Sequence, residues 1–457
     1  MSTTVQNGSG PAAAAPEEDH TDNPLHWLTP EQIEAIGKEF EELHEQVKSD
    51  LGDRDAKYIR SMIALQRQLA LLGRAELVFS RWRLPWVMGA ATLGMAKILE
   101  NMEIGHNVMH GQWDWMNDPV INSRAWDWDT ASTAESWRHS HNYIHHTYTN
   151  IIGKDRDLGY EIMRIDPAQK WHPWYVLQPV YNLILAMLFE WGVALHDLDF
   201  EAIRAGEKDM RQVRKELKGI AGKARAQITK DYIGWPLISG LVMTAIEAGV
   251  LAAKAREEGN TKGLGRRAKR LARKAARKSG RDTVLSQMID RRSFREPFKR
   301  TLTANIVANL IRNVWSYAII FCGHFPDQTF TFTQEETDNE TRGGWYVRQL
   351  CGAANIDGSP LFHVISGNLG YQVEHHLFPD MPSTRYGEIA PRVREICERY
   401  GLPYNTGPFG QQLGMVQRTI LRLAFPGGKA RPKPGPYQGP RYRGEGEKLA
   451  PDLSQAA

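Results

Sequence analysis

The chain has 457 residues, 42% of them hydrophobic, and its 57 Lys and Arg against 53 Asp and Glu give a formal net charge of +4. This length allows a large core, and the composition and the mean hydropathy of −0.47 alone fit a soluble two-domain protein. The average hides several apolar stretches long enough to cross the roughly 30 Å core of a bilayer. No fold-level motif accompanies the basic residues, which argues against nucleic-acid binding.

The N-terminal part of the chain divides into a polar leader and a helical region. Residues 1–25 are rich in Ala, Pro, Gly and Ser, which predicts disorder. They lack a basic start followed by an apolar run, so we expect no secretory signal and a cytoplasmic N-terminus. Thr29-Pro30-Glu31-Gln32 then predicts a helix start with a capping threonine. We expect residues 26–75 to form cytosolic helices.

Four apolar stretches predict membrane helices, and a buried soluble helix is the alternative for any single one of them. They are residues 84–99, 174–195, 232–253 and 304–321. Charged residues lie in or beside them and should face protein, a cavity or the interface, because charge in lipid is costly. These residues are Lys97, Glu190, Glu247 and Arg312. Flanking tryptophans fit an interfacial aromatic belt, namely Trp82, Trp86, Trp174, Trp235 and Trp315.

Histidines concentrate in three short clusters. Eight of the fifteen lie within residues 106–110, 139–146 and 375–376. An isolated histidine is usually structural, but neutral imidazole is the commonest metal ligand, and spacings of three and four residues place two rings on one helical face. The clusters therefore predict a metal site, built from His106, His110, His141, His145, His146, His375 and His376.

The ligand types restrict the choice of metal. Cys322, Cys351 and Cys397 lie far apart without a Cys-x-x-Cys pair, so a zinc finger or an iron–sulfur cluster has no ligand set. The seven clustered histidines exceed what one four-coordinate zinc uses. Two metals are the more economical interpretation, and iron is the usual choice for oxygen chemistry.

Two carboxylates and several single histidines surround the clusters. Asp155 and Asp157 follow the second cluster closely, and they either orient the imidazoles or lie in a solvated turn. We expect His139 and His363 not to be ligands, because His139 breaks the spacing and His363 lies apart from the third cluster. The remaining lone histidines are expected to be structural, namely His20, His26, His44, His172 and His196.

Charged segments indicate the topology. Residues 197–231 carry nine Lys and Arg, which favours a cytoplasmic position and places 174–195 along the membrane surface. Residues 254–281 carry twelve Lys and Arg against two Glu, and they form either an amphipathic helix on anionic lipid or a solvated loop. If residues 174–195 lie along the membrane surface, residues 254–281 are expected on the outer face of the membrane, against the positive-inside tendency. Residues 426–457 are rich in Pro and Gly and are expected to form a flexible tail.

The histidine pattern resembles that of the membrane-bound fatty acyl desaturases over about residues 77–409. The residues that carry the resemblance are His106-xxx-His110, His141-xxx-His145-His146 and Gln372-xx-His375-His376. Residues 103–118 and 321–326 are similar to the bacterial acyl-CoA desaturases of the stearoyl-CoA delta-9 type. The resemblance implies a mostly α fold, with about four membrane helices capped by a cytosolic helical domain, within residues 76–425. It also implies a multi-pass protein of the cell membrane with its active site on the cytoplasmic side.

The resemblance also implies how the site is filled. In this family the boxes hold two irons and use O2 as co-substrate, and a further histidine near the end of the last membrane helix joins them. His324 matches that position. Gln372 is expected to be a weak or water-mediated ligand. The full expected set is His106, His110, His141, His145, His146, His324, Gln372, His375 and His376.

One departure from the pattern leaves the double-bond position open. The third box begins with Gln372 where animal stearoyl-CoA desaturases have histidine, and front-end desaturases share this glutamine. Front-end enzymes usually carry a fused cytochrome b5 with His-Pro-Gly-Gly, whereas the nearest string here is Phe425-Pro426-Gly427-Gly428, which has no haem ligand. Electrons are therefore expected from a separate ferredoxin or NADPH-dependent oxidoreductase.

An unactivated methylene has no acidic proton to remove, so general base catalysis cannot desaturate it and a strongly oxidising metal–oxygen species is required. The resemblance implies desaturation of a long-chain acyl-CoA or acyl-lipid, with delta-9 of stearoyl-CoA as the first expectation. The alternatives are a front-end or acyl-lipid desaturase, a hydroxylase, ketolase or conjugase on the same scaffold, and a membrane metal transporter.

Overall fold

The computed structural model describes residues 23–257, 292–428 and 431–437, and within them the fold is mostly helical. The predicted disorder of residues 1–22, most of the basic segment 254–281, and residues 429–430 and 438–457 of the predicted tail lie outside the described residues. The predicted helix start at Thr29 is confirmed. After the short helix α1 (Pro24–Trp27), α2 (Pro30–Ser49) begins with Thr29 Oγ1 accepting from Gln32 N at 3.3 Å, and Gln32 Oε1 accepting from Thr29 N at 2.9 Å.

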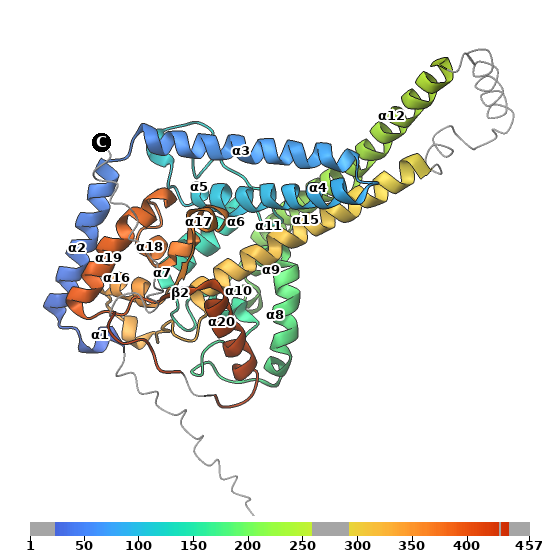
Figure 1. The fold of residues 1–457 in the computed structure, drawn as a ribbon. Coiled ribbons are helices and arrows are strands. Elements are labelled where there is room, and N and C mark those ends of the chain that lie inside the picture. The colour runs from blue at the N-terminus through green and yellow to red at the C-terminus, as the bar shows by residue number, and fades with distance from the viewer. Residues whose placement is uncertain (1–22, 258–291, 429–430, 438–457) are drawn as a thin grey trace, which may run out of the picture.

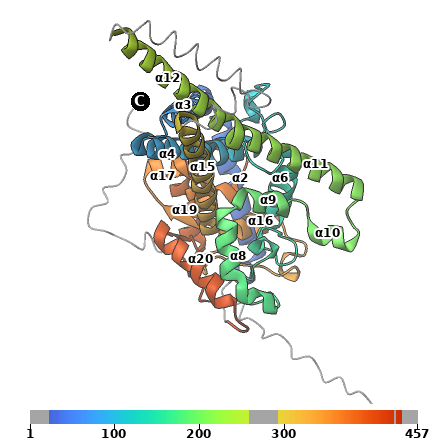
Figure 2. The same cartoon turned by 90° about the vertical axis from the view of Figure 1, so that its right-hand side faces the viewer.

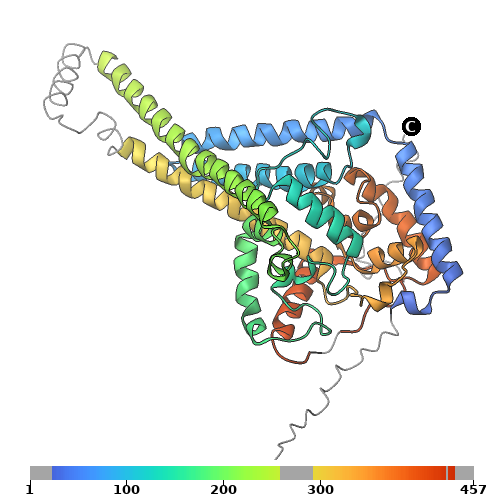
Figure 3. The ribbon, with the colours of Figure 1, turned by 180° about the vertical axis from the view of Figure 1, so that it is seen from behind.

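Four long helices pack into a bundle (Figures 1 and 3). They are α3 (Asp53–Val78), α4 (Arg83–Ile98), α12 (Trp235–Glu257) and α15 (Arg292–His324). The ends of α12 and α15 project beyond the rest of the molecule. Helix α4 packs against both α3 and α15, and α12 packs along α15. Small residues such as Ala90, Ala304 and Ala308 are buried at the crossing and allow close approach. The expected boundary at residues 75–76 falls inside α3 and coincides with no break in the fold.

Every charge noted in the apolar stretches has a partner within the protein. Lys97 Nζ lies 2.8 Å from Asp231 Oδ2, and Glu190 Oε1 lies 2.5 Å from Arg312 Nη2. Glu247 pairs with Arg81. The expectation that these charges face protein is confirmed, and the pairs tie together helices that are distant in sequence.

One described helix, α15, is both long and apolar enough to cross a membrane. A second candidate is a bent pair, in which residues Pro173–Met187 meet Phe189–Ala205 at 103°. This pair contains α8 (Gln178–Met187) and α9 (Phe189–His196), followed by α10 (Phe200–Ala205). The bend lies within the predicted apolar stretch 174–195, so that stretch is not one straight helix.

A second layer of helices lies around the third histidine cluster (Figure 1). It comprises α16 (Arg342–Cys351), α17 (Pro360–Ile365), α18 (Gln372–Leu377), α19 (Tyr386–Tyr400) and α20 (Phe409–Leu423). Two of them, α16 and α19, pack on α2. Its core includes Phe40, Tyr346 and Phe378. Strand β1 (Asn355–Asp357) pairs in parallel with β2 (Thr406–Pro408), with Ile356 opposite Gly407. In Figure 2, α20 and α8 lie side by side, and the two helices are in contact.

The remaining elements are short, apart from α11. They are α5 (Asn107–Met109), α6 (Ala134–Trp137), α7 (His146–Tyr148) and α11 (Met210–Gln227); the π-helices η2 (Leu99–His106), η4 (Arg138–His145) and η7 (Ile228–Gly234); and the 3-10 helices η3 (Asp114–Met116), η5 (Leu158–Glu161), η6 (Pro173–Leu177), η8 (Glu335–Thr337), η9 (Leu369–Tyr371) and η10 (Ser383–Arg385). Within the predicted tail, residues 431–437 lie against the fold, where Lys433 Nζ donates to Thr329 O at 2.6 Å and Tyr437 N donates to Leu402 O at 3.0 Å.

Candidate metal centre

The first two histidine clusters lie at π-helical turns. Helix α4 continues into η2, which ends at His106, and η4 ends at His145. The rings of residues four apart lie close together, with ring centroids 4.5 Å apart for His106 and His110 and 5.1 Å apart for His141 and His145. The spacing predicted rings on one helical face; the chain between His106 and His110 is the α-helical α5, whereas that between His141 and His145 is π-helical. Such π segments are frequent at functional sites.

The other ligand candidates come from two separate elements. His324 is the last residue of α15, while Gln372, His375 and His376 lie on α18. The His324 ring centroid is 4.7 Å from that of His145 and 4.7 Å from that of His376. Residues more than 200 positions apart therefore meet in one buried volume.

The imidazoles form two groups with a third, overlapping one between them. His106, His110, His141 and His375 have ligand atoms within 4.8 Å of one another, and so do His145, His324 and His376. His141, His145 and Asp157 make the overlapping group. The His146 ring lies between the first two, 4.7 Å from His110 and 4.5 Å from His376 by ring centroids.

The donor atoms of these groups suit a metal. Within the described part of the chain, buried ring nitrogens without a hydrogen-bond partner include Nε2 of His110, His141, His145 and His375, Nδ1 of His324, and both nitrogens of His146. A buried, unsatisfied polar atom is destabilising unless something else satisfies it. Burial, together with the neighbouring rings, lowers the pKa of His110, His146, His375 and His376 well below the ordinary value. These rings are therefore neutral, which is the form that binds a metal.

The carboxylates that follow the second cluster contact its rings. His145 Nδ1 lies 3.1 Å from Asp155 Oδ1, and Asn150 N donates to Asp155 Oδ2 at 2.7 Å. His141 Nδ1 lies 3.3 Å from Asp157 Oδ2. Burial opposes ionisation of Asp157, but the hydrogen bond from His141 and the charges of His145 and His196 outweigh it and hold its pKa well below the usual range. An ionised Asp157 fixes the ring tautomer that turns Nε2 toward the centre.

The sequence did not identify several residues that hold the rings. Tyr386 OH lies 3.2 Å from His375 Nδ1, and Gln349 Oε1 lies 2.8 Å from His376 Nδ1. His196 Nε2 lies 3.0 Å from Asp157 Oδ1, although as a lone histidine it was expected to be structural. A His-Asp pair directly after the apolar stretch 174–195 was an available signal for His196. Nothing in the sequence around Gln349 or Tyr386 marks them.

Gln372 lies beside the second group of imidazoles. Its Nε2 is 3.0 Å from His324 Nε2, and its buried Oε1 has no hydrogen-bond partner among the described residues. Gly323 makes room for this side chain, because a Cβ there would come within 2.8 Å of Gln372 Cδ.

The histidines expected not to be ligands lie away from the groups. His139 is exposed and stacks on Tyr143, while His363 stacks on Tyr371 with ring centroids 4.1 Å apart. Of the lone residues, His44 pairs with Asp380 at 3.1 Å, His26 with Glu336 at 3.0 Å, and His172 packs on Trp174. His20 lies outside the described residues.

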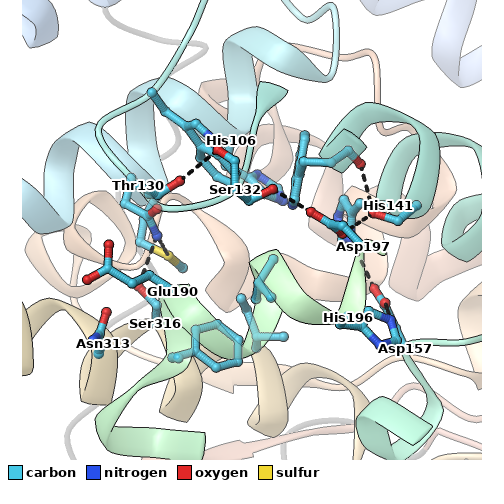
Figure 4. A pocket seen from close by; sticks show the side chains of 18 of the residues that line it. His106, Thr130, Ser132, His141, Asp157, Glu190, His196, Asp197, Asn313 and Ser316 are labelled. Carbon is cyan, nitrogen blue, oxygen red and sulfur yellow. Dashed lines mark hydrogen bonds and ion pairs between the residues drawn. The ribbon is translucent and has the colours of Figure 1, made fainter. Parts of the chain in front are cut away.

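A pocket opens onto the first group of imidazoles (Figure 4). His106 and His141 form one side of it, and Trp128, Trp137, Tyr160 and Phe189 add aromatic walls. The Glu190–Arg312 pair, Asn313 and Ser316 also line it. The pocket therefore combines aromatic walls, a polar and partly charged lining and direct access to two of the candidate ligands.

The helical fold and its buried imidazoles define a candidate metal enzyme, and comparisons with known proteins define its family. The model of the fatty acid desaturase family matches residues 81–253 and 301–408. A NADPH-dependent stearoyl-CoA 9-desaturase of Mycobacterium tuberculosis is 43% identical over 399 residues, 87% of this chain and 82% of that protein. A sn-1 linoleoyl-lipid 6-desaturase of Synechocystis is 22% identical over 338 residues, 70% of this chain and 76% of that one. Human fatty acid desaturase 3 is 35% identical over 88 residues, 19% of this chain and 20% of that one. No solved structure matches the chain.

The chain belongs to the fatty acid desaturase family, and all three histidine clusters lie within the matched residues. It is accordingly an oxidoreductase of lipid metabolism. This membership excludes the metal-transporter alternative.

Proposed function

We propose that this protein introduces a cis double bond at the delta-9 position of stearoyl-CoA, using O2 and a pair of iron ions. The observation that carries the proposal is the convergence of eight histidines from four separate segments on one buried volume beside a pocket with aromatic walls. The 43% identity to a protein named stearoyl-CoA 9-desaturase supports the choice of substrate.

The two groups of imidazoles would each hold one iron. His106, His110, His141 and His375 fit the first site, while His145, His324 and His376 fit the second, with His146 within reach of both and Gln372 beside the second. When bound, the iron pair with O2 supplies the oxidising power that removes hydrogen from an unactivated methylene. Asp155 and Asp157 keep the rings of the second cluster oriented toward the irons.

The pocket in Figure 4 is the proposed site of the acyl chain. Its aromatic walls exclude water and restrict the chain, so that one pair of carbons lies against the edge formed by His106 and His141. Val193 and Ile320 add apolar surface to these walls. The main contribution of the protein is to position the substrate, because the position of the acyl chain in the pocket selects which carbons react.

We propose a multi-pass protein of the cell membrane with four spanning helices, α3, α4, α12 and α15, so that α3, most of which was expected to be cytosolic, is reassigned to the membrane. Helices α3 and α4 pack as one pair and α12 and α15 as another, so the histidine clusters and the N-terminus lie on the same, cytoplasmic side. Exposed Leu65, Leu71, Leu72 and Phe79 on and just beyond α3 support its place in lipid. The bent pair around α8 and α9 lies along the surface, which its 103° bend favours.

Electrons are proposed to come from a separate protein. Phe425-Pro426-Gly427-Gly428 offers no axial ligand for haem. The similar protein of Mycobacterium tuberculosis is named NADPH-dependent, which favours an NADPH-dependent oxidoreductase over a ferredoxin as the donor.

Expression in a desaturase-deficient host fed with stearate tests the function. We expect loss of two hydrogens from the product and a double bond at carbon 9, while His145→Ala and His375→Ala abolish the product. Insertion of oxygen would indicate a hydroxylase, and a double bond nearer the carboxyl end would indicate a front-end enzyme. Absence of any new product with iron-loaded protein and a competent electron donor would contradict the proposal.

A further inference from the structure

His196 and Asp197 hold the second histidine cluster from two directions. They lie at the C-terminal end of α9, where both side chains are buried. Figure 4 shows Asp197 close to His141 and His196 beside Asp157, and all four residues line the pocket. The sequence presents them only as the polar end of an apolar stretch.

His196 contacts Asp157, and Asp157 contacts two candidate ligands. His196 Nε2 is 3.0 Å from Asp157 Oδ1, whereas Asp157 Oδ2 is 3.3 Å from His141 Nδ1 and 3.8 Å from His145 Nδ1. Each oxygen of the carboxylate therefore has its own imidazole partner. Without His196, the carboxylate would keep its contacts on one side only and could rotate away from them.

The position of His196 is itself fixed by its surroundings. Arg156 Nη2 donates to the carbonyl oxygen of His196 at 2.7 Å, and the Tyr160 ring lies 5.2 Å from the His196 ring. Asp197 accepts from Ser140 Oγ at 2.5 Å and also from Ser132 Oγ. Because Ser140 lies within η4, this second contact attaches α9 to the same π-helical segment that carries His141.

Helix α9 also forms a wall of the pocket through Phe189 and Val193. One short helix therefore contacts the proposed acyl chain on one face and orients two proposed ligands from its end. This arrangement couples the position of the acyl chain to the geometry of the metal centre.

We propose that His196 is a positioning residue, which acts through Asp157 to keep the Nδ1 atoms of His141 and His145 engaged so that their Nε2 atoms face the irons. The inference rests on the proposed iron site. Partners of metal-binding histidines typically contribute about 10–100-fold to metal affinity or activity.

The test replaces His196 by Phe, which keeps a ring without a hydrogen bond, and by Gln, which keeps an amide that can donate to Asp157. We expect H196F to lose iron to a chelator about 10–100-fold more readily, to change the visible spectrum of the cobalt-substituted protein, and to lower kcat more than KM. H196Q should recover most of the wild-type behaviour. The matched control is H139F, because His139 is exposed on η4, the segment that carries His141, and contacts Tyr143 rather than a carboxylate.

A double-mutant cycle with Asp157→Asn separates positioning from packing. If His196 acts through Asp157, H196F adds little to the iron loss of the D157N protein; losses that add in full would overturn the proposal. A cobalt spectrum and iron retention of H196F equal to wild type would also overturn it. Should H196F fail to fold, H196N and H196Q provide the same comparison. The asparagine amide is too short to reach Asp157, whereas the glutamine amide reaches it. Equal iron retention in these two variants would contradict the inference. Wild-type protein without iron would instead refute the proposed function itself.

Discussion

Glu190 Oε1 lies 2.5 Å from Arg312 Nη2, which joins α9 to the middle of α15 in the wall of the pocket. Both side chains are almost completely buried. Arg312 also donates from Nη1 to Asp129 O at 3.1 Å, so two other segments of the chain hold its guanidinium group. Charged residues within the apolar stretches therefore form the ion pairs that connect the helices around the site.

Removal of one member of this pair should be strongly destabilising. We expect Glu190→Met to lower the free energy of unfolding by about 3–5 kcal/mol, because it leaves a buried guanidinium without its counter-ion. The double variant Glu190→Met/Arg312→Met should recover part of the loss, since no unpaired charge remains. Thermal unfolding in detergent measures both. If the losses in the free energy of unfolding caused by Glu190→Met and by Arg312→Met simply add in the double variant, the result would contradict this account.

Iron content should follow the two groups of imidazoles. We expect about two irons per chain in the purified protein, with His376→Ala and His110→Ala each losing iron and all activity. His172→Ala is the control, because this exposed histidine packs only on Trp174 among the contacts described. Elemental analysis of the folded variants measures the result. Full iron content in both ligand variants would refute the assignment.

Close packing of α2 against α16 requires glycine at position 343. A Cβ there would lie 2.1 Å from the carbonyl oxygen of Ile33, a backbone atom that cannot move aside easily. We expect Gly343→Ala to destabilise the protein by about 1–3 kcal/mol. Gly414→Ala in α20 is the matched control, since nothing lies within 4 Å of its Cβ position and alanine favours the helix by up to about 1 kcal/mol. Equal melting temperatures for the two variants would show the prediction wrong.

Filling the pocket should reduce activity without loss of iron. Val193→Trp places a large ring in the pocket, so we expect turnover of stearoyl-CoA to fall by at least about 10-fold, because small displacements of a substrate are costly. Leu195→Trp on the exposed side of the same helix should leave turnover near wild type. Product analysis and iron content together distinguish a blocked pocket from a damaged metal site. Unchanged turnover in V193W would place the acyl chain elsewhere.

The purified protein should not oxidise NADPH on its own. We expect oxidation coupled to stearoyl-CoA desaturation only after a separate NADPH-dependent oxidoreductase is added, because the sequence lacks the His-Pro-Gly-Gly motif of a fused cytochrome b5 electron donor. The absorbance of NADPH and the amount of product measure the reaction. Coupled turnover by the isolated protein would contradict the need for an external donor.

The sequence identified the elements of the site because their signals are local. A spacing of four between His106 and His110, and between His141 and His145, is a property of a single helical turn, and the capping box at Thr29 is complete within four residues. The apolar stretches can likewise be recognised from their composition alone. These features depend on neighbours in the chain, so they could be predicted before any tertiary structure was known.

The partners of those residues could not be predicted in this way, because they come from distant segments. Tyr386 and Gln349 reach the third cluster from α19 and α16, His196 reaches Asp157 from the end of α9, and Arg312 meets Glu190 across 122 positions of sequence, as the difference between their residue numbers shows. The π turns and the 103° bend also depend on what packs against them. Sequence by itself determined which side chains are chemically able to bind metal; only the tertiary structure decided which of their nitrogens face one another, because hydrogen bonds from remote helices set the orientation of each ring.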